Sequence, residues 1–264
     1  MAPKTLTRIT RLLLERAAQQ LKGPDYRLDP ELPLSALFGI ARRRIASLLR
    51  GGARARSTSS SRLSPPFLGR DVELRNRRLI TIGRGVTIGR GVIIDGLSRH
   101  GVHIGDNVTI GPYAIIEATG VVSDLGHGCF IGNRSALGSG SFVGAAGGVW
   151  IGEDVIMGNR VNFHSENHVF DDTSRPIREQ GVTRQGIRIE DDCWVGGGVT
   201  FLDGAHVGRG CVVAAGSVVR GEVPPYSVIA GVPAKVIRSR LESSGQSADG
   251  GSPGALPASP SEAA

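Results

Sequence analysis

The chain has 264 residues with a net charge of +7 at pH 7 and only 5% aromatic residues, so its core must be built from aliphatic side chains. Its 39 glycines lack the every-third-residue period of collagen, no run of about 18 apolar residues is long enough to span a membrane, and the N-terminus has no recognisable signal peptide. Three cysteines, an odd number without close metal-ligand spacing, argue against a disulfide scaffold and for a reducing, cytoplasmic compartment.

The first 66 residues form a basic segment. They hold 13 Lys or Arg and 4 Asp or Glu, whereas the rest of the chain is close to neutral. Apolar residues at helical spacing predict a first helix: Leu6, Ile9, Leu13 and Ala17. A second apolar stripe after Pro33 predicts another helix, which we expect to end at Gly51 and Gly52. Residues 51–66 have the composition of a linker.

Two interpretations of these helices are open. They form either a hairpin that packs on the main body or on a sister subunit, or amphipathic helices that lie on an anionic membrane through residues 1–50. A basic appendage on a neutral body favours an acidic surface, such as anionic lipid, over nucleic acid as the partner. We therefore expect no nucleic-acid binding.

A six-residue rhythm runs from residue 79 to residue 222. Each repeat has an aliphatic residue, usually followed by glycine, with a small or β-branched residue four places on, as in Ile151-Gly152 with Val155. A period of six does not fit the 3.6-residue turn of an α-helix. Groups of three repeats predict a triangular coil of about 18 residues with a short strand on each face. The aliphatic residues should point inward and stack at about 4.8 Å.

The cysteines fit this pattern as core residues. Cys129, Cys193 and Cys211 all occupy the small inward position of a repeat. Cys193 and Cys211 are one coil apart, so they should stack on each other. We expect them to fill the core, without a redox or metal-binding role.

The rhythm breaks directly after His168. Residues 169–186 are polar and carry no repeat, so they should leave the coil as a loop, and polar loops on rigid scaffolds often carry active sites. A neutral imidazole with a pKa near 6.5 can remove the proton of a hydroxyl nucleophile. Such a base needs an orienting partner. Asn162, Glu166 and Asn167 are near in sequence, and a residue of an adjacent coil or subunit is an equal alternative.

Two motifs resemble one protein family. The segment Ser-Glu-Asn-His-Val-Phe-Asp-Asp at 165–172 is similar to the segment with the catalytic histidine in polysaccharide and sugar O-acetyltransferases. The closing segment Pro-Pro-Tyr-Ser-Val-Ile-Ala-Gly-Val-Pro-Ala-Lys-Val-Ile-Arg at 224–238 resembles the end of the same enzymes. Together with the repeats over residues 79–240, they resemble the hexapeptide-repeat acyltransferases. The resemblance implies an all-β fold, a left-handed parallel β-helix, which in this family assembles as trimers.

The resemblance also implies a reaction and its residues. Acetyl-CoA would be the co-substrate, no metal would be needed, and the acetyl group would pass to a hydroxyl of a sugar or surface-polysaccharide precursor. His168 matches the general base of the family, with Asn162 and Glu166 as candidate partners. The donor would be bound by residues that match the family's groove: Trp194 on the pantetheine arm, Gly197 and Ala215 through the main chain, and Lys235 and Arg238 on the phosphates.

Arg220 marks a departure from the family pattern. Many relatives have Thr-Lys after the Ser-Val-Val run, and here Arg220 and Gly221 follow it. Arg220 is therefore a candidate replacement for the phosphate-binding lysine, with weaker phosphate binding as the alternative.

The predicted organisation has three parts. Residues 1–66 form the helical basic segment and linker, and residues 67–241 form the β-helix with loop 169–186 and a C-terminal capping segment. After Pro233 we expect a short helix that caps the coil. Residues 242–264 have the Ser, Gly, Ala and Pro-rich composition of a disordered tail.

Three alternative functions share this fold. An amino-sugar N-acyltransferase would use the same donor site. A γ-type carbonic anhydrase would place three histidines on a metal, and His127, His164 and His168 have a superficially similar spacing, but His127 and His164 fall at different places in the repeat. A non-catalytic β-helix scaffold would bind no coenzyme A.

Overall fold

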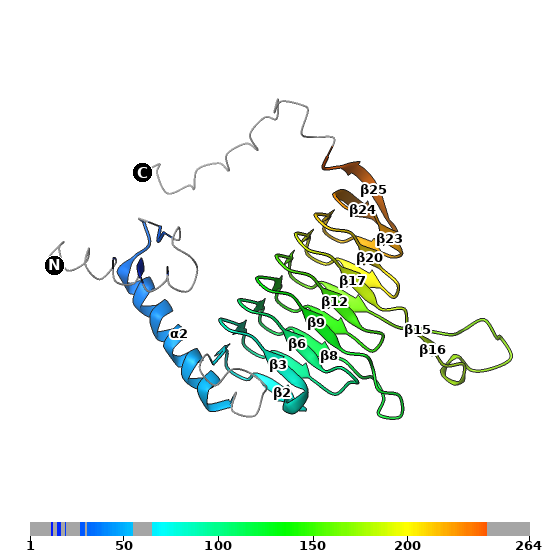
Figure 1. Ribbon diagram of the computed structural model, residues 1–264, viewed down its shortest axis with the longest axis horizontal. Helices are drawn as coiled ribbons and strands as arrows, with labels where there is room; N and C mark the ends of the chain where they lie inside the picture. The colour runs from blue at the N-terminus through cyan, green and yellow to red at the C-terminus, as the bar shows by residue number, and fades with distance from the viewer. Residues whose placement is uncertain are drawn as a thin grey trace, which may run out of the picture.

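The computed structural model describes residues 27–29, 31–54 and 65–241, together with four single positions between residues 12 and 19. The residues that predict the first helix (Leu6, Ile9, Leu13 and Ala17) lie outside the described residues, as do 55–64 of the predicted linker and the predicted tail 242–264. The second predicted helix is α2 (Leu34–Arg54). Figure 1 shows α2 beside the first coils of a long stack of short strands.

The stack has three faces, which we call A, B and C. Face A is a nine-stranded sheet: β1 (Phe67–Leu68), β4 (Thr87–Ile88), β7 (Thr109–Ile110), β10 (Ala136–Leu137), β13 (Ile156–Met157), β18 (Trp194–Val195), β21 (Val212–Val213), β24 (Ser227–Gly231) and β25 (Ala234–Ser239). Face B has seven strands: β2 (Glu73–Arg75), β5 (Ile93–Asp95), β8 (Ile115–Glu117), β11 (Phe142–Gly144), β14 (Asn162–His164), β19 (Thr200–Leu202) and β22 (Val218–Val219).

Face C also has seven strands: β3 (Ile80–Ile82), β6 (Val102–Ile104), β9 (Cys129–Ile131), β12 (Val149–Ile151), β17 (Ile187–Ile189), β20 (His206–Val207) and β23 (Glu222–Val223). A small separate sheet pairs β15 (Asn167–His168) with β16 (Val182–Thr183). The short 3-10 helices η2 (Arg77–Leu79) and η3 (Ile177–Glu179) complete the described elements.

The chain folds as a left-handed parallel β-helix, as expected. Neighbouring coils pair in parallel register, and the inward residues stack in columns such as Val143, Phe163 and Phe201 on face B. All three are fully buried, and the rings of Phe163 and Phe201 stack with centroids 4.9 Å apart. The columns form one continuous, mainly aliphatic core, whose burial is the main source of stabilisation of the stack.

The predicted burial of the cysteines and the stacking of Cys193 on Cys211 are confirmed. Cys129, Cys193 and Cys211 are buried and free, and the pairing of Trp194 with Val212 sets Cys193 directly over Cys211 in the next coil. Burial raises the pKa of the Cys129 thiol to about 12, so it stays protonated in the core.

The three corners of the coil differ in regularity. At the corner between faces A and B (the AB corner), successive inward residues are six positions apart, as from Val195 to Phe201. The same spacing holds at the corner between faces C and A. The corner between faces B and C (the BC corner) varies in length. Extra residues enter there between Ile116 and Ile131, and again between Phe163 and Ile189. Insertions are thus collected at one edge of a regular scaffold.

Two arginines of helix α2 contact the first two coils. The Arg44 guanidinium lies 5.0 Å from the ring centroid of Phe67 and donates a hydrogen bond of 2.9 Å to the Thr87 hydroxyl. Arg50 Nε donates to the Leu68 carbonyl at 2.9 Å. Within the described part of the chain, no helix has the length and apolar character that a membrane crossing needs.

The helix boundary prediction at Gly51 and Gly52 is wrong, because α2 continues to Arg54. The physical reason is a close approach of two backbones. A Cβ atom at Gly51 would lie 1.8 Å from the Pro66 carbonyl oxygen, so glycine is needed there for packing against the incoming chain.

The predicted capping helix after Pro233 is also wrong. The segment is strand β25, which folds back antiparallel on β24. Its β-branched Val236 and Ile237 favour an extended backbone. The reversal covers the free edge of β24, which would otherwise expose unpaired backbone groups.

Candidate functional site

The predicted loop after His168 leaves the stack as a hairpin at the BC corner. Asn167 pairs with Thr183 and His168 with Val182 in the antiparallel ribbon of β15 and β16, and Figure 1 shows this ribbon projecting from the side of the stack. The excursion is therefore confirmed, but its base is an ordered two-stranded ribbon. The Val169 N–H donates to the Gly181 carbonyl at 3.0 Å, so ladder hydrogen bonds of the residues on either side fix the backbone position of His168.

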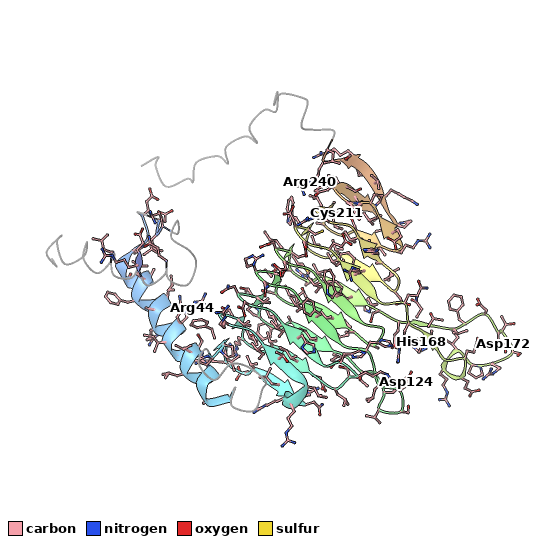
Figure 2. The ribbon with its side chains drawn as sticks, in the orientation of Figure 1. Arg44, Asp124, His168, Asp172, Cys211 and Arg240 are labelled. Carbon is pink, nitrogen blue, oxygen red and sulfur yellow. The ribbon has the colours of Figure 1, made fainter. Side chains whose placement is uncertain are left out.

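His168 lines an open cavity of about 470 Å³ at the base of the hairpin. The other lining residues come from the hairpin and from the next two coils, among them Phe170, Asp171, Leu202, Asp203 and Arg220. The His168 side chain is exposed, and Figure 2 shows it where the ribbon leaves the stack. None of the other described residues forms a hydrogen bond with its imidazole. Both ring nitrogens are therefore available to a substrate.

Asp203 fixes the returning strand of the hairpin. Its carboxylate is largely buried and accepts hydrogen bonds from the backbone N–H groups of Gln185 at 2.9 and 3.0 Å and of Gly186 at 2.8 Å. Charged acceptors form the stronger class of hydrogen bond. The carboxylate therefore sets the register in which β16 pairs with the strand that carries His168.

A second clamp joins the hairpin to the earlier insertion at the BC corner. Arg184, whose side chain is 13% exposed, forms ion pairs with Asp124 at 2.9 Å and with Glu166 at 3.1 Å. Sequence reasoning missed Asp124, Arg184 and Asp203. These residues are far apart in sequence, and Asp124 and Arg184 lie in irregular segments, so no local pattern could have grouped them.

The two sequence-predicted partners of the base lie away from its imidazole. Glu166 is engaged by Arg184. Asn162 begins strand β14 beside the AB corner, and its side-chain amide donates to the Arg160 carbonyl at 3.2 Å. Asn167 lines the cavity with His168. Within one chain, the structure thus groups His168 with Arg220 and Asp203, and groups neither Glu166 nor Asn162 with the imidazole.

The predicted donor-binding glycine and alanine stack at the AB corner. Gly197 lies below Ala215, and the Gly216 N–H donates to the Gly197 carbonyl at 2.9 Å. The coils are packed so closely here that a Cβ on the neighbouring Gly196 would lie 2.5 Å from the Ala215 nitrogen. Small residues therefore leave the backbone of this corner open to a long ligand.

The remaining predicted donor residues are distributed over face A and the BC corner. Trp194 projects from face A with 60% of its surface exposed. Val212, Val228 and Arg238 occupy the equivalent position on the next three strands of face A. Lys235 lies opposite Ala230 on the terminal strand pair. Arg220 differs, because it lines the cavity of His168.

The site is consequently divided between two edges of face B. Strand β19 runs from the AB corner, where Gly197 lies, to the BC corner, where Asp203 and the His168 cavity lie. In a single chain the width of a face separates His168 from Gly197 and Ala215, the residues predicted to bind the donor.

The histidines of the carbonic anhydrase alternative are not brought together. His164 projects from face B next to the Phe142 ring, with centroids 5.8 Å apart, and His127 lies against His100 at 6.3 Å. Among the residues that the structure describes, no cluster of three or more His, Cys, Asp or Glu side chains has metal-binding geometry. This arrangement does not support the γ-type carbonic anhydrase alternative.

Two sequence families match the coils. Residues 186–221 match the bacterial transferase hexapeptide family, six repeats, and residues 80–118 match the hexapeptide repeat of succinyl-transferase. These segments are the last and the first coils of the same stack.

Similar proteins carry acyltransferase names. "Probable acetyltransferase Rv3034c" of Mycobacterium tuberculosis is 32% identical over 62% of this chain and 51% of its own length. "Putative lipopolysaccharide biosynthesis O-acetyl transferase WbbJ" of Escherichia coli is 28% identical over 62% of this chain and 74% of its own. The chain thus spans about half the length of the first relative.

A solved structure that aligns with this chain is a mutant of AntD, an N-acyltransferase of Bacillus cereus, in complex with dTDP-4-amino-4,6-dideoxyglucose and coenzyme A. It has 17% sequence identity and a TM-score of 0.47, with 74% of this chain and 93% of that chain covered. The repeats and their stacked coils agree with the two family matches: residues 80–118 and 186–221 match the hexapeptide repeats of transferases.

Proposed function

We propose that the protein transfers an acetyl group from acetyl-CoA to a hydroxyl group of a sugar in a surface polysaccharide or its precursor, with His168 as the general base. The observation that carries this proposal is the exposed imidazole of His168, fixed on an ordered ribbon beside an open cavity. The acetyltransferase names of the two relatives support the donor, and the lipopolysaccharide O-acetyl transferase supports a sugar acceptor.

The reaction needs no covalent enzyme intermediate. A neutral ring nitrogen of His168 accepts the proton of the acceptor hydroxyl as its oxygen attacks the thioester carbonyl carbon. The carbon–sulfur bond then breaks, the imidazolium returns the proton to the departing thiolate, and the products are the acetyl ester and free coenzyme A. Positioned general bases of this kind contribute about 10² to 10⁴ in rate.

The donor would lie along the AB corner. Its pantetheine arm fits the exposed Trp194 ring and the small residues Gly197 and Ala215. Lys235 and Arg238 lie on the terminal strand pair of face A, the face that also carries Trp194. Their positive charge suits the phosphates of the donor. Arg220 lines the cavity of His168, so we assign it to the acceptor or to the thioester end of the donor.

A second copy of the chain would complete the site. His168 and the donor residues lie at opposite edges of face B, so the base of one subunit meets the groove of its neighbour when the edges of two copies are brought together. A closed ring of three copies makes three such sites, and we propose a homotrimer.

The N-terminal helix would hold the enzyme at a membrane. Exposed apolar residues follow one side of α2, namely Phe38, Ile45 and Leu49, and its sequence has arginines but no Asp or Glu. Anionic lipid would attract such a surface. Because acetyl-CoA is a cytoplasmic metabolite, we propose a cytoplasmic enzyme at the inner membrane surface. Flotation with anionic liposomes should be lost when residues 1–66 are deleted; equal binding would contradict this.

The alternative acceptor is the amino group of a sugar, because an N-acyltransferase would use the same base and the same donor groove. The products separate the two reactions. An ester is cleaved by hydroxylamine and an amide is not. A screen of sugar and amino-sugar acceptors with acetyl-CoA, followed by thiol release, tests the proposal, with His168→Ala as the control. Unchanged turnover in that variant would remove the assignment.

A further inference from the structure

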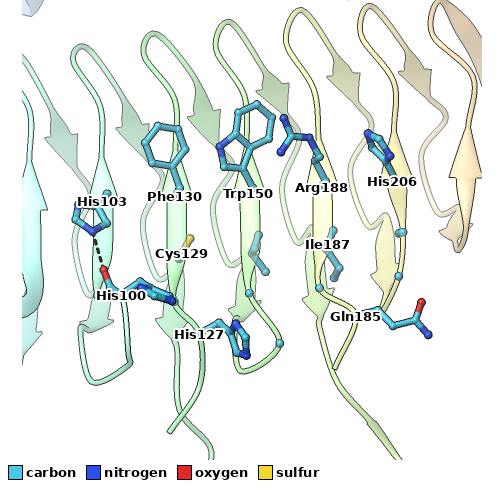
Figure 3. A pocket seen from close by; sticks show the side chains of 18 of the residues that line it. His100, His103, His127, Cys129, Phe130, Trp150, Gln185, Ile187, Arg188 and His206 are labelled. Carbon is cyan, nitrogen blue, oxygen red and sulfur yellow. Dashed lines mark hydrogen bonds between the residues drawn. The ribbon is translucent and has the colours of Figure 1, made fainter. Parts of the chain in front are cut away.

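A second open cavity, of about 520 Å³, lies on the other side of the BC corner, along face C. Figure 3 shows aromatic and basic side chains standing in a row above it, with histidines along the corner. Its volume lies within the range of ligand-binding clefts, about 300–1,000 Å³. The residues that define it are His100, His127, Phe130, Trp150, Gln185 and Arg188.

An ordered aromatic ridge forms one wall of this face C cavity. Phe130 and Trp150 occupy the same outward position on neighbouring strands, and their rings stack in parallel at 5.9 Å with 7° between planes. The Arg188 guanidinium covers the next position, 3.9 Å from the Trp150 ring centroid. These contacts hold the ridge rigid before any ligand arrives, while Phe130 keeps 41% of its surface exposed.

Polar groups surround the ridge and carry charges of both signs. His206 is held between Glu190, at 3.2 Å, and Glu222, at 2.9 Å. Gln185 presents its side chain at the corner, as Figure 3 shows. One arginine and two carboxylates give no excess positive charge for a phosphate or a polyanion.

Glycines line much of the floor of the cavity. Glycines with positive φ turn the corner in successive coils, including Gly128 at +126° and Gly148 at +97°. Side chains at these bends are therefore absent, and a ligand can approach the main chain closely. A neutral ligand with an apolar face and a rim of hydroxyl groups suits this surface, because its C–H face packs on the aromatic ridge and its hydroxyls reach the surrounding donors and acceptors.

The two cavities adjoin through the hairpin base. Thr183 and Asp203 line the cavity of His168, whereas Gln185 and Gly204 line the face C cavity. The hydrogen bonds from the Gln185 N–H to the Asp203 carboxylate lie at the boundary between the two cavities. One extended molecule can therefore occupy both. A trimer that joins the two edges of face B leaves face C directed outward, so the cavity stays accessible.

We propose that the face C cavity is a glycan subsite, which binds the sugar residues next to the one that is acetylated at His168. The proposal rests on the proposed function for the identity of the acceptor as a glycan. The acceptor is then an oligosaccharide or a polymer, because a single sugar would fill only the cavity of His168 and leave the face C cavity empty.

Tryptophan fluorescence tests the subsite directly. The chain has two tryptophans, so Trp194→Phe leaves Trp150 as the only reporter. The probe is an array of neutral trisaccharides to hexasaccharides, followed by titration of the bound glycans into the full-length Trp194→Phe protein without coenzyme A. We expect at least one glycan to bind and to change the Trp150 emission. Absence of binding across the array would overturn the proposal.

Variants then locate the binding. Phe130→Ala and Arg188→Ala in the Trp194→Phe background should each weaken binding roughly tenfold, whereas Tyr113→Ala, an exposed aromatic at the AB corner of an early coil, should not. Thermal melting confirms that each variant is folded. Wild-type affinity in both cavity variants would overturn the proposal.

Different results would contradict the glycan subsite and the proposed acetyl transfer. If His168→Ala keeps glycan binding and the cavity variants lose it, the subsite stands whatever the turnover. If the cavity variants acetylate long and short acceptors like the wild type, the subsite is wrong and the proposed function stands. If no acceptor is acetylated but glycans bind at Trp150, the proposed function is wrong, and the face C cavity is a glycan-binding site that is not an acceptor subsite.

Discussion

The AB corner and the BC corner are built from the same repeat and have opposite characters. At the AB corner the repeat is kept in every coil, and small residues such as Gly197 and Ala215 stack on each other. At the BC corner the repeat is interrupted, and both adjoining cavities lie there. The comparison suggests a division of labour, in which a regular edge binds the common donor and an irregular edge holds the base and selects the acceptor.

The largest expected effect is at the irregular corner. His168→Ala should lower kcat by about 10³, because a general base acts in the transition state, and should leave the affinity for acetyl-CoA unchanged. Steady-state kinetics and donor titration measure both. His164→Ala is the matched control, since His164 is an exposed histidine on strand β14 four residues earlier. Equal losses in the two variants would contradict the assignment.

Asp203→Ala should loosen the hairpin, although Asp203 forms no hydrogen bond with the His168 imidazole. It removes the charged acceptor of the Gln185 and Gly186 N–H groups, and it should cost about 2 kcal/mol of local stability. Hydrogen exchange in residues 167–183 should rise and turnover should fall, while the core remains protected. Asp203→Asn keeps one carbonyl acceptor and should show a smaller effect. Unchanged exchange in both variants would show that the hairpin is held elsewhere.

The close packing of the regular corner predicts a contrast between neighbouring glycines. A Cβ at Gly196 would lie 2.5 Å from the Ala215 nitrogen, whereas a Cβ at Gly197 would meet its nearest atom, the Asn159 carbonyl oxygen, at 3.3 Å. Gly196→Ala should therefore lower the free energy of unfolding by about 2 kcal/mol, and Gly197→Ala by much less. Denaturant unfolding measures both, and the reverse order would contradict the packing.

The smallest expected effect concerns the donor. Trp194→Ala should raise KM for acetyl-CoA roughly tenfold, about 1.4 kcal/mol, with little change in kcat, because the ring contacts a part of the donor that does not react. Its 60% exposure means that the fold does not depend on it. Ile156→Ala, an exposed residue paired with Trp194 on the preceding strand, is the packing control. A fall in kcat alone would place Trp194 at the reacting centre.

The periodic part of the fold was predictable and the irregular part was not. The six-residue repeat predicted three faces, the inward aliphatic columns and the stacked cysteines, because each inward position is set by the same local spacing. Strand β25 and the end of α2 depend on contacts with β24 and with Pro66, which no local pattern encodes. The same reason hid the clamp of Arg184 on Asp124 and Glu166. It also hid the position of Asp203 beside the His168 cavity, although a residue of an adjacent coil was one of the alternatives left open.

The central claim is that the base and the donor groove of one working site come from different copies of the chain. Turnover of mixed oligomers tests it most directly. His168→Ala lacks the base, and Ala215→Trp blocks the groove, so each variant alone should be inactive. After subunit exchange, we predict that activity returns, because some interfaces pair an intact BC corner with an intact AB corner. Mixed oligomers that have exchanged subunits and stay as inactive as their parents would contradict the claim.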